Sequence, residues 1–418
     1  MKTVIHKVVW CMVLVCFFCA SVSCSNDSDD VSDASEAGRV VLAYLVANNN
    51  LDANLINNVV WMYRGLARAD KASTLLVYYK GCRNLTTSTI LRFRTNGRGK
   101  INGKDVLAES EQSVANVLAQ AERIAAVDGN AVNKDIMKAN LQKMQSLAPA
   151  SHYALIFASH ATGWLPSSGS ESRSFGNDNS YEIDIPDMAQ ALRESFPQHN
   201  VDFILFDACM MGTAEVCYEL RDVARYCMVS VMEVPSVGFP YYTFMDKLYA
   251  DDVDLRYVCD QTVAYNKSNG LWGTYAVIDC GQMERLAEQT KVQLMQHHTE
   301  WKQLDYDRIQ QYGLWQNKFL YFSFDLAEVI KKLNGGGELP DSYRQALDKA
   351  VVYKTCVGAI ENPKPSVKPW AEVFDDESKY CGLGIYLPGR DINTSWDAYL
   401  PSLAWYQAAG WDTLLATE

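Results

Sequence analysis

The sequence predicts an α/β fold with a mostly parallel central sheet covered by helices on both faces. Short apolar runs rich in β-branched and aromatic residues alternate along the chain with segments of helical spacing. Two of these runs, 153–157 and 201–206, read as strands buried on both sides. Strands alternating with helices build a parallel sheet, because each crossover places a helix on one face of it.

The first segment, residues 1–23, predicts an export signal. Lys2 and Lys7 precede an apolar run at 8–20, and small residues follow. This layout is typical of a secretory signal. The run is too short to span a bilayer, which takes about 20 apolar residues.

The next segment, residues 24–37, predicts a flexible acidic tether that begins at Cys24. Small residues directly before a cysteine resemble a bacterial lipobox, in which the Cys24 thiol would take a diacylglycerol. Ser21 stands where a lipobox usually has leucine, so cleavage and release is the alternative. The acidic stretch resembles the surface-export tract of Bacteroidetes lipoproteins, which implies an outer-membrane or cell-surface protein of a Gram-negative bacterium.

The remaining chain divides into a core at 38–254 and a C-terminal α/β subdomain at 255–418 packed on it. In the core, strands are expected at 39–47, 74–79, 89–94, 153–157, 201–206 and 227–232. Helices are expected at 53–69, 110–127, 134–147, 185–196 and from just after Cys209 to about Tyr226, and a loop precedes the helix at 185. In the last third, strands are expected at 275–278 and 383–387 among helices.

Composition narrows the function. The chain has 418 residues and is 48% hydrophobic, which is typical of a globular protein. Its net charge of −12 argues against nucleic acid as a partner. Four of its 12 cysteines lie in the first 24 residues. The other eight are an even number, which permits disulfides in an exported protein, and their wide spacing does not suggest a zinc ribbon.

Two of the expected strands end in reactive side chains. His160 follows the strand at 153–157, and Cys209 follows the strand at 201–206. Ligands of an open parallel sheet bind beyond the carboxyl ends of its strands, so these two residues share a crevice if their strands are neighbours. We expect a helix to begin at Cys209, so that its dipole and the imidazole favour a thiolate. The alternative is a buried structural cysteine, as we expect for Cys217, Cys227 and Cys280.

Residues beside this pair could complete a catalytic site. The loop that begins at Ala161 can direct backbone N–H groups into the crevice as an oxyanion hole, together with the N–H of Cys209. Asp207 should point to the same side as Cys209, where its carboxylate could bind a basic substrate side chain. Capping of the next helix is an equal alternative for Asp207.

The stretches LIFASHATGW and DFILFDACMMGTAEVCYEL around these residues resemble the histidine and cysteine motifs of the clostripain family, cysteine peptidases of the caspase-like clan. AYLVANNNLD, VMEVPSVGFPY, SFDLAEVIKKL, GLGIYLP and the closing AAGW also resemble it, so the likeness spans nearly the whole chain after the tether. The resemblance implies a caspase-like α-β-α sandwich. It also implies that His160 is the general base and acid, Cys209 the nucleophile, and Asp207 the acidic floor of a pocket for arginine or lysine.

The resemblance carries further expectations. Family members resemble zymogens that cut themselves in the loop after the histidine, and Arg173 is the site offered here. The chemistry requires no cofactor, although calcium promotes activity in several relatives and the acidic loop at 177–179 could supply oxygen ligands. The family usually has glycine where this chain has Ala161, and alanine resists a positive φ.

The leading hypothesis is therefore a secreted or surface-anchored cysteine endopeptidase whose partners are protein or peptide substrates with arginine or lysine. One alternative is a catalytically silent caspase-like lipoprotein that binds peptides or glycans, for which Ala161 is the best argument. Another is a cysteine-dependent acyl or peptidyl transferase, in which an amine instead of water resolves the acyl-enzyme.

Overall fold

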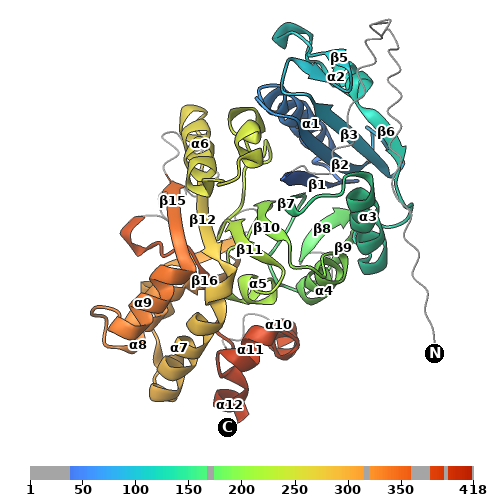
Figure 1. Ribbon diagram of the computed structural model, residues 1–418. Helices are drawn as coiled ribbons and strands as arrows, with labels where there is room; N and C mark the ends of the chain where they lie inside the picture. The colour runs from blue at the N-terminus through green and yellow to red at the C-terminus, as the bar shows by residue number, and fades with distance from the viewer. Residues whose placement is uncertain (1–37, 167–173, 315–319, 359–376, 390–393, 417–418) are drawn as a thin grey trace, which may run out of the picture. The chain divides into compact units, whose positions relative to one another are not determined.

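A computed structural model describes residues 38–166, 174–314, 320–358, 377–389 and 394–416. Its main sheet runs β15-β12-β11-β10-β7-β1-β2-β3-β4-β5, with β6 also paired to β3 (Figure 1). The five parallel strands are β1 (Arg39–Ala47), β2 (Ser73–Gly81), β7 (His152–Ala158), β10 (Val201–Asp207) and β11 (Ala224–Val229). The expected α/β fold with a mostly parallel sheet is confirmed.

Antiparallel strands extend this parallel centre on both sides. One side adds β12 (Gly273–Asp279) and β15 (Val351–Val357). The other side adds β3 (Thr89–Thr95), β4 (Lys100–Ile101), β5 (Lys104–Asp105) and β6 (Glu122–Ala125). The centre of the sheet therefore carries the crossover connections, and hairpin-type pairing is confined to its flanks.

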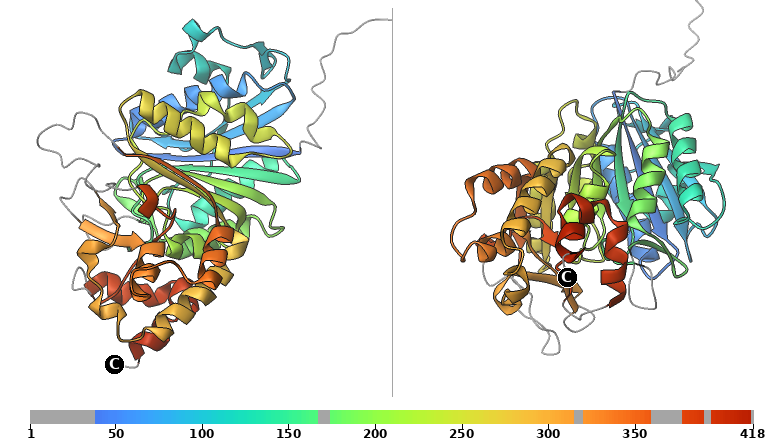
Figure 2. Two further views of the ribbon diagram at one scale, coloured as in Figure 1. Left: turned by 90° about the vertical axis from the view of Figure 1, so that its left-hand side faces the viewer. Right: turned by 90° about the horizontal axis from the view of Figure 1, so that it is seen from below.

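Helices bury both faces of the sheet because successive strand residues point to opposite sides. Val41, Ala43 and Leu45 of β1 belong to one core, which is covered by α1 (Asp52–Leu66), α2 (Val114–Gln120) and α6 (Leu255–Ser268). Leu42 and Tyr44 belong to the opposite core. Helices lie on both sides of the sheet (Figure 2). That second core is covered by α3 (Lys134–Leu147), α4 (Ile185–Ser195), α5 (Ala214–Glu219), α7 (Met283–Gln296), α8 (Leu326–Leu333), α9 (Asp341–Ala350), α10 (Thr394–Tyr399), α11 (Ala404–Ala408) and α12 (Trp411–Ala416).

Smaller elements lie around this sandwich. A second sheet orders as β13 (Gln311–Leu314), β14 (Leu320–Asp325) and β16 (Gly384–Ile385), and a hairpin pairs β8 (Phe175–Asp178) with β9 (Tyr181–Ile183). The short 3-10 helices are η1 (Glu109–Glu111), η2 (Tyr241–Thr243), η3 (Met245–Tyr249), η4 (Cys280–Gln282), η5 (Trp301–Gln303), η6 (Tyr306–Arg308), η8 (Glu377–Lys379) and η9 (Leu400–Ser402).

Two expected helices are wrong in part. The segment at 110–127 holds the short helix α2 and then β6, because residues 122–125 pair with β3 and this pairing overrides helical propensity. The segment after Cys209 is not helical: it turns at Met210, whose φ is 60°, and the backbone N–H groups of Met210 and Gly212 donate to the carbonyl oxygens of Met232 and Ser230. Only Ala214–Glu219 is helical there, and β11 begins at Ala224, three residues before the expected strand. The loop expected before the helix at 185 contains the β8–β9 hairpin.

The C-terminal third shares the main sheet and its core. β12 and β15 lie in the same sheet as β1, and Glu215 of α5 accepts a hydrogen bond from the backbone N–H of Tyr386. The division at residue 254 stays a prediction, and these contacts show how closely its two parts would pack. Among the described residues, no helix is long and apolar enough to cross a membrane.

Candidate active site

His160 and Cys209 leave adjacent parallel strands at the same level. β7 pairs with β10, and in the last pair Ala158 stands opposite Asp207. His160 comes two positions after Ala158, and Cys209 comes two positions after Asp207. Neighbouring strands lie about 4.8 Å apart. The expectation that the two strands are neighbours is confirmed, and both side chains belong to the carboxyl end of the sheet.

The His160 ring contacts a residue that sequence reasoning missed. Its Nε2 atom lies 2.5 Å from Oδ1 of Asn50, in the turn after β1. An amide oxygen only accepts hydrogen bonds, so Nε2 carries the proton in this contact. Asn50 therefore holds the ring from its Nε2 side.

Asn48 and Asn49 fix the same turn to β8. Asn48 donates from Nδ2 to Asp178 Oδ1 at 2.6 Å, and Asn49 donates to the carbonyl of Asn177 at 2.7 Å. The sequence signal is three consecutive asparagines, Asn48 to Asn50, between the strand expected at 39–47 and the helix expected at 53–69. Because β1 is the neighbour of β7, this turn is held beside His160.

The Cys209 thiol lies against the loop after β11. Its Sγ accepts a hydrogen bond from the backbone N–H of Val234 at 3.3 Å. Burial raises the pKa of the thiol most, and the negative charges of Glu233 and Asp207 raise it further, to about 12, against the lowering effect of the Val234 N–H. The substrate-free protein therefore holds Cys209 as a neutral thiol at neutral pH.

The expected helix start at Cys209 is wrong. α5 begins only at Ala214, and Thr213 caps it through a hydrogen bond to the N–H of Val216. Because dipole effects fade within the first turn, α5 does not stabilise a thiolate at Cys209. Ionisation has to come from a base that takes the thiol proton.

Asp207 does not cap the next helix either. Its Oδ2 accepts hydrogen bonds from the N–H of Phe239 at 3.0 Å and from the hydroxyl of Tyr241 at 2.8 Å. Burial raises the pKa of this carboxyl to about 6, although both hydrogen bonds lower it. A Cβ on Gly238, whose φ is 74°, would come within 2.6 Å of that oxygen, so glycine lets the loop close over the carboxylate.

Ala161 forms an isolated antiparallel bridge with Phe175 of β8. In this bridge the N–H of Gly176 donates to the backbone carbonyl oxygen of His160, and the N–H of Thr162 donates to the backbone carbonyl oxygen of Ser174. Peptide groups alternate in direction along an extended segment, so the N–H of Ala161 faces away from β8. In the described residues of this loop, the left-handed position is Gly163 at φ 71°, so the expected strain at Ala161 is absent.

The loop at 177–179 does not suit calcium. Asp178 is buried, and its Oδ2 lies 2.7 Å from the ammonium of Lys80 and accepts the N–H of Ala131 at 2.6 Å. Its other oxygen accepts from Asn48, so the charge is already paired and both oxygens are used. No group of three metal-ligating side chains is found in the described part of the chain. Arg173 and Cys24 lie outside the described residues.

Cys217, Cys227 and Cys280 are fully buried, as expected for core cysteines. Burial raises the pKa of Cys217 well above its usual value.

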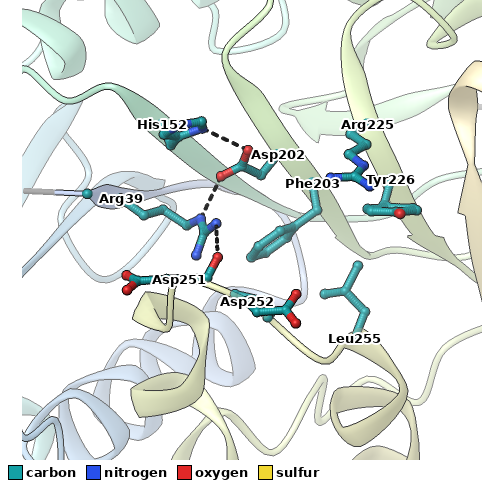
Figure 3. Close-up of a pocket in the computed structure, with 11 residues that line it drawn as sticks. Arg39, His152, Asp202, Phe203, Arg225, Tyr226, Asp251, Asp252 and Leu255 are labelled. Atoms are coloured by element: carbon teal, nitrogen blue, oxygen red, sulfur yellow. Dashed lines mark hydrogen bonds and ion pairs between the residues drawn. The ribbon is translucent and has the colours of Figure 1, made fainter.

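A cavity of about 400 Å³ lies at the opposite end of the sheet, where the parallel strands begin (Figure 3). There Asp202 pairs with Arg39 Nε at 2.7 Å and with His152 Nδ1 at 3.0 Å. Arg39 and His152 are the first residues of β1 and β7, whereas His160 and Cys209 follow strand ends. This cavity is therefore separate from the crevice predicted at the carboxyl ends.

Comparisons with known proteins show which family this sequence and fold resemble. The clostripain family model matches residues 43–417. Clostripain from Hathewaya histolytica is 23% identical over 231 residues, which is 50% of this chain and 42% of that protein. The chain thus spans less than half the length of that relative.

Two solved structures share the fold. One is an inactive zymogen C11 protease from Parabacteroides distasonis, with a TM-score of 0.70 and 24% identity over 89% of this chain and 98% of that one. The other is a secreted C11 cysteine protease from Bacteroides thetaiotaomicron in complex with an irreversible peptide inhibitor, with a TM-score of 0.70 and 24% identity over 90% and 99%. The expected caspase-like sandwich is confirmed by these matches.

Proposed function

Because the chain belongs to the clostripain family of cysteine peptidases, we propose that it hydrolyses peptide bonds after arginine or lysine through Cys209 and His160. The observation that carries the proposal is the register of β7 and β10, which sets these two residues at the same level on neighbouring strands. No other described cysteine follows a strand that neighbours the strand before His160.

The local chemistry suggests how the pair would act. The thiol pKa of about 12 means that His160 must take the proton as the sulfur attacks the substrate carbonyl. The N–H groups of Ala161 and Cys209 would stabilise the negative oxygen that develops. The C–N bond then breaks, the leaving amine receives the proton from His160, and water hydrolyses the thioester to free Cys209.

Two carboxylates support a preference for cationic substrates. Besides burial, the negative charges of the half-exposed Glu233 and of Asp207 raise the pKa of the Cys209 thiol. Both carboxylates therefore lie near the place where a substrate would bind. Oδ2 of Asp207 is used by the loop, which leaves Oδ1 as the atom that we assign to a substrate cation. A guanidinium or ammonium there would favour the ionised carboxylate and remove part of its burial cost.

The proposal is tested with purified residues 25–418 and fluorogenic peptides that end in arginine, lysine, aspartate or leucine. We expect hydrolysis of the two basic substrates only, without added calcium, and loss of that activity in Cys209→Ala. Added amine acceptors separate hydrolysis from transfer, because a transferase would yield the amide product. The absence of turnover in both intact and Arg173-cut protein would support the silent alternative, which Ala161 no longer favours.

Asn50 offers a test of how His160 is positioned. We expect Asn50→Ala to lower kcat roughly 10- to 100-fold with little change in KM, because the ring loses the partner that orients it. Asn50→Asp should recover part of that rate. It should also move the acid limb of the pH profile to higher pH, since a carboxylate raises the pKa of the imidazole.

Asn57→Ala is the matched control, because Asn57 is exposed on the same helix that follows the turn. If Asn50→Ala and Asn57→Ala show the same rate, Asn50 does not position His160.

We also propose that the protein is made as an exported zymogen. Its loop after His160 would be cut at Arg173, and Cys24 would carry the lipid that holds it at the outer membrane or cell surface. The acidic tether and signal-like sequence support export. For the cut, N-terminal sequencing of the processed protein should find a new terminus at Ser174.

For the lipid anchor, Cys24→Ala should move the protein from the membrane fraction to the soluble fraction.

A further inference from the structure

Two buried cysteines lie in contact on neighbouring strands of the main sheet. Cys227 is in β11, and Cys280 is the first residue of η4, directly after β12. Their sulfur atoms are 3.4 Å apart, and both side chains are fully buried. Nothing in the proposed peptidase chemistry uses either thiol.

The strand register explains why the two side chains meet. β11 and β12 are antiparallel, and Cys227 stands opposite Ile278. Cys280 follows Ile278 by two positions, which places it diagonally from Cys227 on the same face of the sheet, within the same apolar core. The contact therefore results from the pairing of the two strands and not from a chance approach of surface loops.

We propose that Cys227 and Cys280 form a disulfide when the protein folds in an oxidising compartment. A disulfide requires the sulfur atoms to close from 3.4 Å to about 2.05 Å, which a rotation of the two side chains supplies if the Cα atoms stay within about 7 Å. This inference depends on export and is independent of the proposed peptidase activity.

The oxidation needs an electron acceptor, which we assign to the class of disulfide-bearing oxidants such as a thiol–disulfide oxidase of the periplasm. The thiolate of one cysteine attacks the oxidant's disulfide, forms a mixed disulfide and releases one thiolate of the oxidant. The second cysteine, as a thiolate, then displaces the oxidant's other sulfur. In total, two cysteine thiols lose two protons and two electrons, and the oxidant becomes a dithiol.

Burial decides when this can happen. Contact with Cys227 and burial both raise the pKa of Cys280 well above its usual value, so the Cys280 thiol of the folded protein reacts slowly. The disulfide should form while β11 and β12 are still pairing, and the closed core should then shield it from reductants. It would act as a structural link and not as a reversible switch.

The link would brace the loop that touches the nucleophile. β11 leads directly into residues 230–234, where Met232 accepts the N–H of Met210 and Val234 contacts the Cys209 sulfur. A disulfide between Cys227 and Cys280 ties the strand that precedes this loop to η4, which leads directly into α7.

The test counts thiols in the Cys209→Ala protein, so that the nucleophile cannot oxidise. Both samples consist of residues 25–418, with an added export signal for the periplasmic one, and in this variant they hold seven cysteines. Protein exported to a bacterial periplasm, denatured without reductant and alkylated, should show five free thiols, whereas protein made in a reducing cytosol should show seven. Peptide mapping without reduction should find one linked pair that contains Cys227 and Cys280.

Seven free thiols in the exported protein would overturn the proposal, and so would a linked pair involving Cys217, whose pKa is also raised by Cys280. As a second measurement, the exported protein should melt several degrees higher than the same protein made in a reducing cytosol. That shift should be lost in the Cys227→Ala, Cys280→Ala double variant and kept in the Cys217→Ala, Cys259→Ala control. Equal shifts in both double variants would also count against the link.

Discussion

Replacing Cys209 with alanine is expected to lower kcat/KM for arginine peptides by at least about 10⁴-fold. The variant keeps the fold but removes the atom that would form the thioester. Cys217→Ala is the matched control, because Cys217 is buried in α5 and lies outside the site. The control should retain most of its activity, with only a modest loss of stability from the missing sulfur. Comparable activity in Cys209→Ala and the wild type would exclude Cys209 as the nucleophile.

The alkylation rate of Cys209 gives a second test of its ionisation state. Because the pKa of the Cys209 thiol is raised to about 12, little thiolate exists in the substrate-free enzyme at neutral pH. Its rate of alkylation by iodoacetamide should therefore be slow at pH 7 and rise about tenfold per pH unit through pH 9. A rate that is constant between pH 5 and pH 8 would instead show a thiolate–imidazolium pair formed before substrate binds.

Replacing Asp207 with asparagine is expected to lower kcat/KM for arginine and lysine substrates by roughly 100-fold or more, because truncating one member of a buried charge pair costs about 2–5 kcal/mol. Asparagine has nearly the same shape, and its amide oxygen can still accept the N–H of Phe239 and the hydroxyl of Tyr241. The loss should therefore be confined to cationic substrates. A leucine peptide, however slowly it is cut, serves as the internal control.

The pH dependence follows from the raised pKa of Asp207. The carboxyl is mostly ionised above pH 6 and protonated below it, so KM for basic peptides in the wild type should rise as the pH falls through about 6. Asp207→Asn should remove this dependence. An equal fall in activity on basic and neutral peptides would show that Asp207 only holds the loop at 237–241.

The elements that the sequence predicts well are those with an uninterrupted pattern. The strand at 39–47 and the helix at 134–147 coincide with β1 and α3, because apolar continuity and helical spacing are local properties of the chain. The same continuity at 153–157 and 201–206 placed His160 and Cys209 just beyond the ends of two strands, and the structure then showed that these strands are neighbours. These two positions were predictable because the end of a strand can be located from the sequence pattern without knowing any side-chain contact.

The side-chain partners were not predictable in the same way. Asn50 and His160 are separated by 110 positions in the sequence, and Asp207 and Tyr241 by 34. Neither contact has a local pattern, because each joins the end of a sheet strand to a segment that is distant in the sequence. The non-helical course after Cys209 was missed for a related reason, since the backbone N–H groups of Met210 and Gly212 bond to Met232 and Ser230 and not within a helix.

The central place of β7 and β10 in the sheet has a consequence for how the protein opens. Each strand is bonded to a parallel neighbour on both sides, and both faces are covered, whereas β4 and β5 are two-residue strands at an edge. Backbone amides in β7 and β10 should exchange with deuterium only through global unfolding, while amides at the edge exchange through local fraying. Warming that frays the edge strands should thus leave His160 and Cys209 in register, so that activity outlasts the first loss of structure.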